Sequence, residues 1–159
     1  MVEKNDASLV KISEYLEHYH VLTVAGQDHD GLWAANCFYV WDRENVRFII
    51  LADLKTRHGR IMQETSQVCG TVSDQESNVS HLQGVQFVAQ SERLAGESEK
   101  AARALFYQKF PIARARPSPI WGIYVQSMKM MNNRLGFGTK KIWTRSWDVN
   151  LDGNDCYNG

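Results

Sequence analysis

VRFIILADLKTRHGR, the stretch from Val46 to Arg60, joins an apolar run to a densely basic segment. The apolar run, VRFIIL, is typical of a buried β-strand. Four cationic or potentially cationic side chains then follow within six positions: Lys55, Arg57, His58 and Arg60. A short helix is expected from about Thr56 to Glu64, with Ile61 and Met62 turned inward. The stretch therefore predicts a strand that leads into a helix with a positively charged start.

Two interpretations of the basic segment remain open from these residues alone. The free N–H groups and positive dipole end of a helix favour an anion, and Thr56 adds a hydroxyl. A phosphate monoester carries about −1.5 to −2 charges at neutral pH. Three charge-assisted hydrogen bonds of roughly 1.5–3 kcal/mol each would hold such a group, before ordering costs. The alternative is a helix start whose charges are only solvated.

The residues before this stretch predict a helix followed by an antiparallel meander. Apolar residues spaced 3, 4 and 3 apart from Leu9 to Tyr19 lie on one helix face, with Asp6 or Ser8 as the cap. Three strands follow, separated by two tight turns at residues 27–31 and 42–45. They are expected at Val21–Ala25, Leu32–Trp41 and Val46–Leu51.

The residues after the basic helix predict more strands and one more helix. The strands are expected at Val68–Ser73, Leu82–Leu94, Ile120–Met131 and Leu135–Arg145. Gly84 is expected at a bulge or a close approach of the backbone. A helix opened by Ser98 is expected around Ala101–Phe106. Six or seven strands with short connections predict a mainly β protein, a small antiparallel barrel with peripheral helices.

The composition narrows the class of protein. The 159 residues favour one domain, with 43% hydrophobic and 23% charged residues. A net charge of zero argues against general binding to nucleic acid, and no apolar run is long enough to cross a membrane. The first residues are unlike a secretory signal, and three scattered cysteines favour a reducing, cytoplasmic location. Residues 1–145 are expected to form the domain and residues 146–159 a polar, flexible tail.

Motifs for metal or hydrolytic chemistry have little support in the sequence. The segment Asp148–Gly153 matches the first positions of a calcium loop, but the final ligand position is Gly159 instead of glutamate. His18 and His20 have no third ligand nearby, and no H-E-x-x-H, G-x-S-x-G or G-x-G-x-x-G occurs. We therefore expect no metal site.

The order of several short motifs carries a resemblance to a known family. These are LWAANCFYV, FIIL…KTRH, CGTV, GVQF, FPIAR, W-G-I and LGFGTKKIW. Between Leu9 and Arg145 the chain resembles the YhbP-like proteins, an uncharacterised bacterial family of the pyridoxamine 5′-phosphate oxidase-like, FMN-binding split-barrel superfamily. The resemblance implies a six-stranded antiparallel split β-barrel that forms a homodimer, with FMN in clefts between the subunits.

The same resemblance implies which residues hold the cofactor. The segment that grips the FMN phosphate in the superfamily corresponds here to Lys55, Thr56, Arg57 and His58. A lysine or arginine is more usual where His58 stands, so phosphate affinity should depend on pH. The flavin ring is expected against Asn36, Leu51 and Ala52 of one subunit, and against Gln86, Lys141 and Trp143 of the partner subunit.

Departures from the superfamily pattern limit the functional prediction. The segment NRLGFGTKKIW lacks the arginine-rich signature that binds the substrate phosphate in true pyridoxamine phosphate oxidases, so that activity is not implied. Haem-binding relatives use a histidine in a C-terminal extension, whereas the last histidine here is His81.

The leading prediction is a flavoprotein oxidoreductase that passes electrons or hydride from NADH or NADPH to an unknown acceptor. The alternatives are a non-catalytic flavin-binding or sensory protein, and a split barrel for another phosphorylated ligand, such as pyridoxal phosphate or a deazaflavin. No catalytic acid or base is identified.

Overall fold

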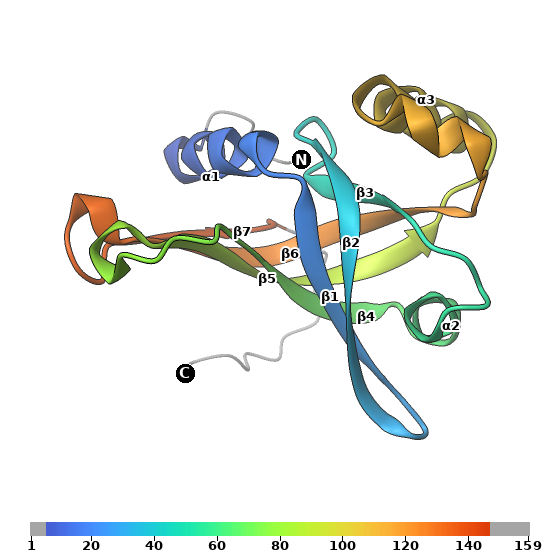
Figure 1. Ribbon diagram of the computed structural model, residues 1–159, viewed down its shortest axis with the longest axis horizontal. Coiled ribbons are helices and arrows are strands. Elements are labelled where there is room, and N and C mark those ends of the chain that lie inside the picture. Colours follow the sequence, from blue (N-terminus) through green and yellow to red (C-terminus); the bar gives the residue numbers. More distant parts are fainter. Residues whose placement is uncertain (1–5, 147–159) are drawn as a thin grey trace.

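A computed structural model describes residues 6–146, which form seven strands, three α-helices and three short 3₁₀ helices (Figure 1). The strands are β1 (Val21–Asp28), β2 (Gly31–Asp42), β3 (Arg47–Leu51), β4 (Gln67–Ser73), β5 (Gln83–Arg93), β6 (Ile120–Asn132) and β7 (Lys140–Thr144). The α-helices are α1 (Ala7–His18), α2 (Arg57–Glu64) and α3 (Gly96–Lys109). The 3₁₀ helices are η1 (Val79–His81), η2 (Pro111–Ala115) and η3 (Asn133–Leu135).

The strands form a closed antiparallel barrel. Their order is β3-β2-β1-β4-β5-β6-β7, and β3 also pairs with β6. That pairing closes β1 to β6 into a six-stranded ring, and β7 extends the sheet beyond β6. The expected meander of the first three strands and the six-stranded barrel are confirmed.

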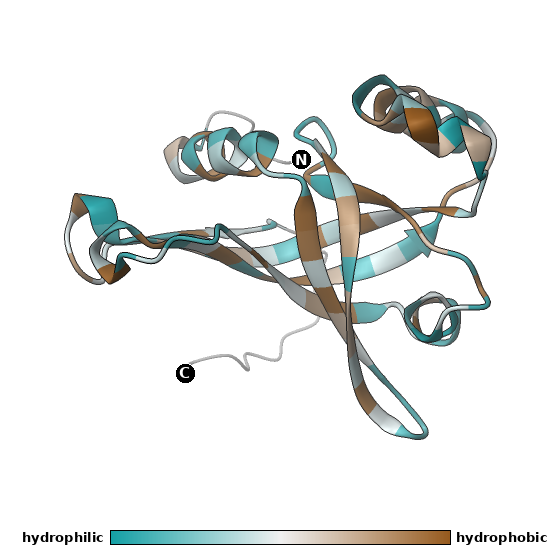
Figure 2. Cartoon of the chain, in the orientation of Figure 1, coloured by the Kyte–Doolittle hydropathy of each residue, from teal (hydrophilic) through white to brown (hydrophobic). Residues whose placement is uncertain are grey.

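Buried and exposed residues alternate along the strands, and the buried ones form the core. β4 has the burial pattern exposed–buried throughout its length, and β5 alternates in the same way from Val85 onward. The inward residues of the barrel make one hydrophobic cluster with α1, which includes Phe48, Phe87 and Trp121. A second cluster lies outside the barrel, where α3 packs against β3 and β6. Figure 2 shows hydrophobic residues along the strands and mostly hydrophilic residues on α2 and in the turns.

Hydrogen bonds fix α1 on the barrel. Asp6 caps its start by accepting from the amides of Ser8 and Leu9, as expected. The Tyr39 hydroxyl donates to the Leu16 carbonyl at 2.7 Å. The Trp41 indole N–H donates to the hydroxyl of Ser13 at 3.0 Å. The two buried aromatic side chains of β2 thus have their polar atoms paired by the helix.

Three local predictions were wrong. α3 begins at Gly96, whose φ of +61° turns the chain directly from β5 into the helix, so Ser98 lies inside the first turn and is not the cap. The last strand begins only at Lys140, because residues 133–139 form η3 and a turn. The bulge expected at Gly84 is the third: Gly84 pairs regularly with Met131, and the irregularity in the β5–β6 ladder falls between Val88 and Ala89.

The boundary of the domain stays a prediction. Only Ser146 of the expected tail lies within the described residues, and the Asp148–Gly153 segment lies outside them. Among residues 6–146, no helix is long and apolar enough to span a membrane.

Candidate functional site at the start of helix α2

The start of α2 is held by a compact turn after β3. Thr56 is the N-cap, and its hydroxyl oxygen accepts from the Gly59 amide at 3.1 Å. The same hydroxyl donates to the Asp53 carbonyl at 2.6 Å. A Cβ on residue 59 would collide with that carbonyl, so glycine is what permits the turn to close on the helix. The Thr56 hydroxyl therefore positions the helix start and is already engaged.

Backbone donors remain at this helix start. The amide of Lys55 donates to the Asp53 carboxylate at 2.8 Å, and the amide of Thr56 to the Asp53 carbonyl at 3.0 Å. Within residues 6–146, no acceptor is found for the amides of Arg57 and His58. These two N–H groups point along the helix axis with the positive dipole end, the arrangement that binds phosphates.

Arg57 reaches from α2 to the tip of the β1–β2 hairpin. Its Nε donates to one carboxylate oxygen of Asp28 at 2.9 Å, and its Nη2 donates to the other at 2.8 Å. The guanidinium also lies over the ring of Trp33, 4.8 Å from the centroid. The hydrogen bond from Arg57 lowers the pKa of Asp28 to about 2. The pair therefore stays charged at any physiological pH.

The other side chains of the basic segment differ in burial and in hydrogen bonding. His58 is half-buried, and burial lowers the pKa of its imidazole, so the ring is neutral at pH 7. Its Nε2 lies 3.5 Å from the Thr56 hydroxyl. The Lys55 side chain is exposed, while Arg60 donates through Nη1 to the Lys55 carbonyl at 3.0 Å. The four residues predicted to hold a phosphate are thus gathered around one helix start.

The lowered pKa of His58 predicts a pH-dependent stability. Since the folded-state pKa lies below the ordinary value of 6.5, the unfolded chain takes up a proton first as the pH falls. The contribution of His58 to stability is therefore complete above pH 6.5 and declines below it. Thermal unfolding of wild type and His58→Gln at pH 7.5 and 5.5 should show wild type losing more stability than the variant. Parallel losses would contradict this account of His58.

Asn36 and Gln86 lie on the outer face of the barrel, in one row across four strands. Outward residues pair in register there as Asn36–Thr23–Thr71–Gln86, and the next row is Ala34–Ala25–Cys69–Val88. We call these eight residues the uncharged face, since none of them is Asp, Glu, Lys, Arg or His. Asn36 accepts a 2.9 Å hydrogen bond from the Thr23 hydroxyl. About 10 Å of strand separates Ala25 of this face from Asp28, at roughly 3.3 Å per residue, and Asp28, three positions on, points to the opposite side of β1, toward α2.

The remaining predicted ring contacts are not gathered on this face. Ala52 is buried, its amide donates to the Pro119 carbonyl at 3.1 Å, and its carbonyl accepts from the Trp121 indole at 3.0 Å. Its backbone is therefore already engaged. The neighbouring Leu51 is half-buried and packs against the cluster under α3.

The expected grouping of Gln86 with Lys141 and Trp143 needs correction. Trp143 is only 5% exposed and belongs to the barrel core. Because side chains alternate along a strand, Lys141 lies on the same side of β7 as Trp143. Ile142 is the β7 residue in the outward row of Gln86, through Lys129 of β6. The structure thus places Gln86 on one face of the sheet and the other two residues on the opposite face.

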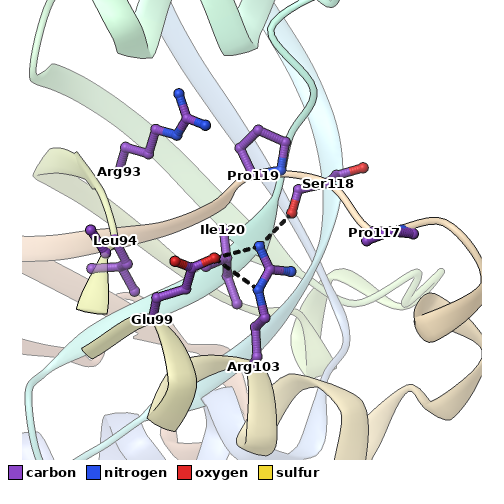
Figure 3. Close-up of a pocket in the computed structure, with 9 residues that line it drawn as sticks. Arg93, Leu94, Glu99, Arg103, Pro117, Ser118, Pro119 and Ile120 are labelled. Atoms are coloured by element: carbon purple, nitrogen blue, oxygen red, sulfur yellow. Dashed lines mark hydrogen bonds and ion pairs between the residues drawn. The ribbon is translucent and has the colours of Figure 1, made fainter. Parts of the chain in front are cut away.

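A separate cavity of about 470 Å³ lies between α3 and the start of β6 (Figure 3). Arg103 on its wall donates to Glu99 at 2.8 Å and to the Ser118 carbonyl at 2.9 Å, so its charge is already paired. Arg93 points away from that pair in the figure. The lining contains none of the predicted cofactor residues. This cavity is therefore distinct from the α2 site.

Sequence reasoning missed Asp28 and Trp33, the two hairpin residues that hold Arg57. Asp28, His29 and Asp30 also lie close enough together to be a metal group, but both oxygens of Asp28 accept from Arg57. The only signal in the sequence was the Asp-Gly turn, which indicates a hairpin but not its contact with α2.

Comparison with known proteins identifies close relatives. The chain is 41% identical over 134 residues to the UPF0306 protein plu4501 of Photorhabdus laumondii, covering 84% of this chain and 94% of that protein. It is 41% identical over 139 residues to the UPF0306 protein YhbP of Escherichia fergusonii, covering 87% and 95%. No family model matches the chain.

Solved structures with the same fold are more distant in sequence. A heme binding protein from Mycobacterium smegmatis superposes with a TM-score of 0.75 at 18% identity, covering 88% of this chain and 59% of that one. An FAD-binding protein from Mesorhizobium loti gives 0.63 at 12% identity, covering 76% and 90%. A candidate pyridoxamine 5′-phosphate oxidase from Listeria innocua gives 0.63 at 12% identity, covering 78% and 98%. At these identities the likeness establishes the split-barrel fold.

Proposed function

The chain belongs to the UPF0306 family, and from this premise we propose that it is an FMN-binding flavoprotein that acts as a homodimeric oxidoreductase. In this proposal the FMN phosphate binds at the start of α2, and the flavin lies along the uncharged face between two subunits. The solved structures of the same fold include a heme binding protein and an FAD-binding protein, so a ligand of this size suits the fold.

The observation that carries the proposal is the set of unused donors at the start of α2. The amides of Arg57 and His58 lack acceptors among residues 6–146, and Arg57 keeps three N–H groups after its two bonds to Asp28. Lys55 adds an exposed positive charge. This donor set fits a phosphate monoester, which accepts several charge-assisted hydrogen bonds at once.

The uncharged face supports a second copy of the chain as partner. Exposed hydrophobic side chains gather on and beside it, including Val88 on the face and Val21 and Phe38 at its margin. A contiguous outward surface of four strands without a charge is unusual in a protein whose residues are 23% charged. Packing this face on its own copy would bury it isologously, as most homodimers do.

A charge placed on this face should separate the subunits. Val88 is 50% exposed at the centre of β5, and Val88→Arg would place two guanidinium groups in a desolvated interface. We expect sedimentation to show a dimer for wild type and a monomer for the variant. Leu105→Arg is the matched control, since Leu105 is 41% exposed but lies on α3, away from the face. A dimeric Val88→Arg would contradict this interface.

The protein's own residues would bind and orient the cofactor. FMN, when bound, supplies hydride and electron transfer chemistry. Arg57, Lys55 and the two amides would hold the phosphate. Asn36 and Gln86 would offer amide groups to the polar edge of the ring. The face's small side chains, such as Ala25 and Ala34, would leave room for a planar ring system.

The test is spectroscopic and has three outcomes. Purified protein mixed with FMN and passed through a desalting column should retain a flavin spectrum near one equivalent per chain. Anaerobic addition of NADH or NADPH should then bleach it. Retention without bleaching would favour a non-catalytic flavin-binding or sensory protein. No retention would overturn the proposal and leave another phosphorylated ligand, such as pyridoxal phosphate or a deazaflavin, to be tried.

A further inference from the structure

Asp28 and Arg57 meet in a defined geometry. Nε and one Nη2 hydrogen of Arg57 donate to the two carboxylate oxygens at 2.9 and 2.8 Å, so the carboxylate occupies one long edge of the guanidinium. Trp33 covers one face of the same plane. Of the five N–H groups of arginine, the two at Nη1 and one at Nη2 stay unpaired within the described part of the chain. The free Nη2 hydrogen and one Nη1 hydrogen lie side by side at the far end of the plane, a fork that matches two phosphate oxygens, and the second Nη1 hydrogen points along the edge opposite Asp28.

We infer that Asp28 is a positioning residue for the flavin phosphate, holding Arg57 side-on so that its free end is presented to the ligand. The inference rests on the proposed function and assigns a role to a residue outside the basic segment. Trp33 completes the support by stacking beneath the guanidinium. The hairpin tip, far from α2 in sequence, thereby becomes part of the phosphate site.

The pair also has a simpler interpretation, a surface ion pair that only ties the hairpin to α2. Exposed pairs of that kind contribute little to stability, because two long side chains must be held in one arrangement. The side chains here are only 26% and 11% exposed, for Arg57 and Asp28 respectively, and their contact is bidentate. A positioned guanidinium loses less rotational freedom when a ligand arrives, which favours binding. The two interpretations differ in what they predict for ligand affinity.

The test compares two variants with the same charge. Asp28→Asn and Asp28→Ala both remove the carboxylate charge, which repels a phosphate, but asparagine keeps one oxygen that can accept from Arg57. FMN and riboflavin affinities are measured for each by flavin fluorescence. Asp28→Ala should bind FMN roughly two- to tenfold more weakly than Asp28→Asn. In the alanine variant the Arg57 side chain has no partner at residue 28, so FMN binding must also immobilise this one rotamer-rich side chain. Riboflavin, which has no phosphate, should bind both variants equally.

Controls separate this inference from the proposed function. Asp30 lies on the same hairpin and is well exposed, so Asp30→Asn and Asp30→Ala should bind FMN equally. Equal FMN affinities for Asp28→Asn and Asp28→Ala would overturn the positioning role. A parallel loss of riboflavin would do the same, since it would show damage to the fold. If wild type itself does not prefer FMN to riboflavin, the proposed function fails instead.

Discussion

Replacing Arg57 by alanine is expected to weaken FMN binding roughly 100-fold and to leave riboflavin binding unchanged, since about two charge-assisted hydrogen bonds are lost. Arg57 is permanently charged and is held in place by Asp28 and Trp33. Riboflavin has the same ring but no phosphate, so it reports on the rest of the site. Fluorescence titration of both flavins measures the two effects.

Arg60→Ala is the matched control for this variant. It removes the same charge one helical turn away, but Arg60 is exposed and donates to the Lys55 carbonyl. Its effect on FMN should be small, because an exposed charge is screened by salt. Equal weakening of FMN and riboflavin by Arg57→Ala would mean that Arg57 serves the fold instead of the phosphate.

Replacing Arg47 by alanine is expected to lower the free energy of unfolding by roughly 3–5 kcal/mol, because it leaves a buried carboxylate without its counter-charge. The side chains of Arg47 and Asp42 are 5% and 7% exposed, and Nε lies 2.7 Å from the carboxylate. Its Nη1 donates to the hydroxyls of Tyr124 at 2.8 Å and Ser98 at 3.3 Å, which links β3 to β6 and α3. Denaturant unfolding at pH 7 measures the change.

Two comparisons give this prediction its control. Arg43→Ala breaks an exposed ion pair with Glu17 and should change stability by about 1 kcal/mol or less. The double variant Arg47→Ala with Asp42→Ala should be less destabilised than the sum of the two single changes, because no charge is then left unpaired. If Arg47→Ala alone lowers the free energy of unfolding by less than about 1 kcal/mol, the expectation that this buried ion pair holds the fold together is contradicted.

Local patterns in the sequence were sufficient for most of the fold. The apolar run of β3, the strand expected at Leu82–Leu94 and the helical spacing of α1 each depend on near neighbours, and the structure confirms all three elements. The start of α3 was misplaced because Ser98 matches a cap pattern, whereas the chain turns earlier at Gly96. A cap signal gives no information on where the preceding strand ends.

The site was less predictable because it depends on which side of a strand a residue lies and on distant contacts. Lys141 and Trp143 were grouped with Gln86, and only the register of β5, β6 and β7 shows that they lie on opposite faces. Asp28 and Arg57 are 29 positions apart, and their contact depends on α2 packing beside β1. The charges and their spacing in the sequence indicated the basic segment, but they did not indicate that the carboxylate of Asp28 holds Arg57.

Whether the start of α2 binds the flavin phosphate is decided by the preference of the wild-type protein for FMN over riboflavin. Both dissociation constants are measured by equilibrium fluorescence titration in a buffer without phosphate. We expect FMN to bind roughly 100-fold or more tightly than riboflavin, because the phosphate accepts at least two charge-assisted hydrogen bonds. Equal affinities, or no binding of either flavin, would contradict it.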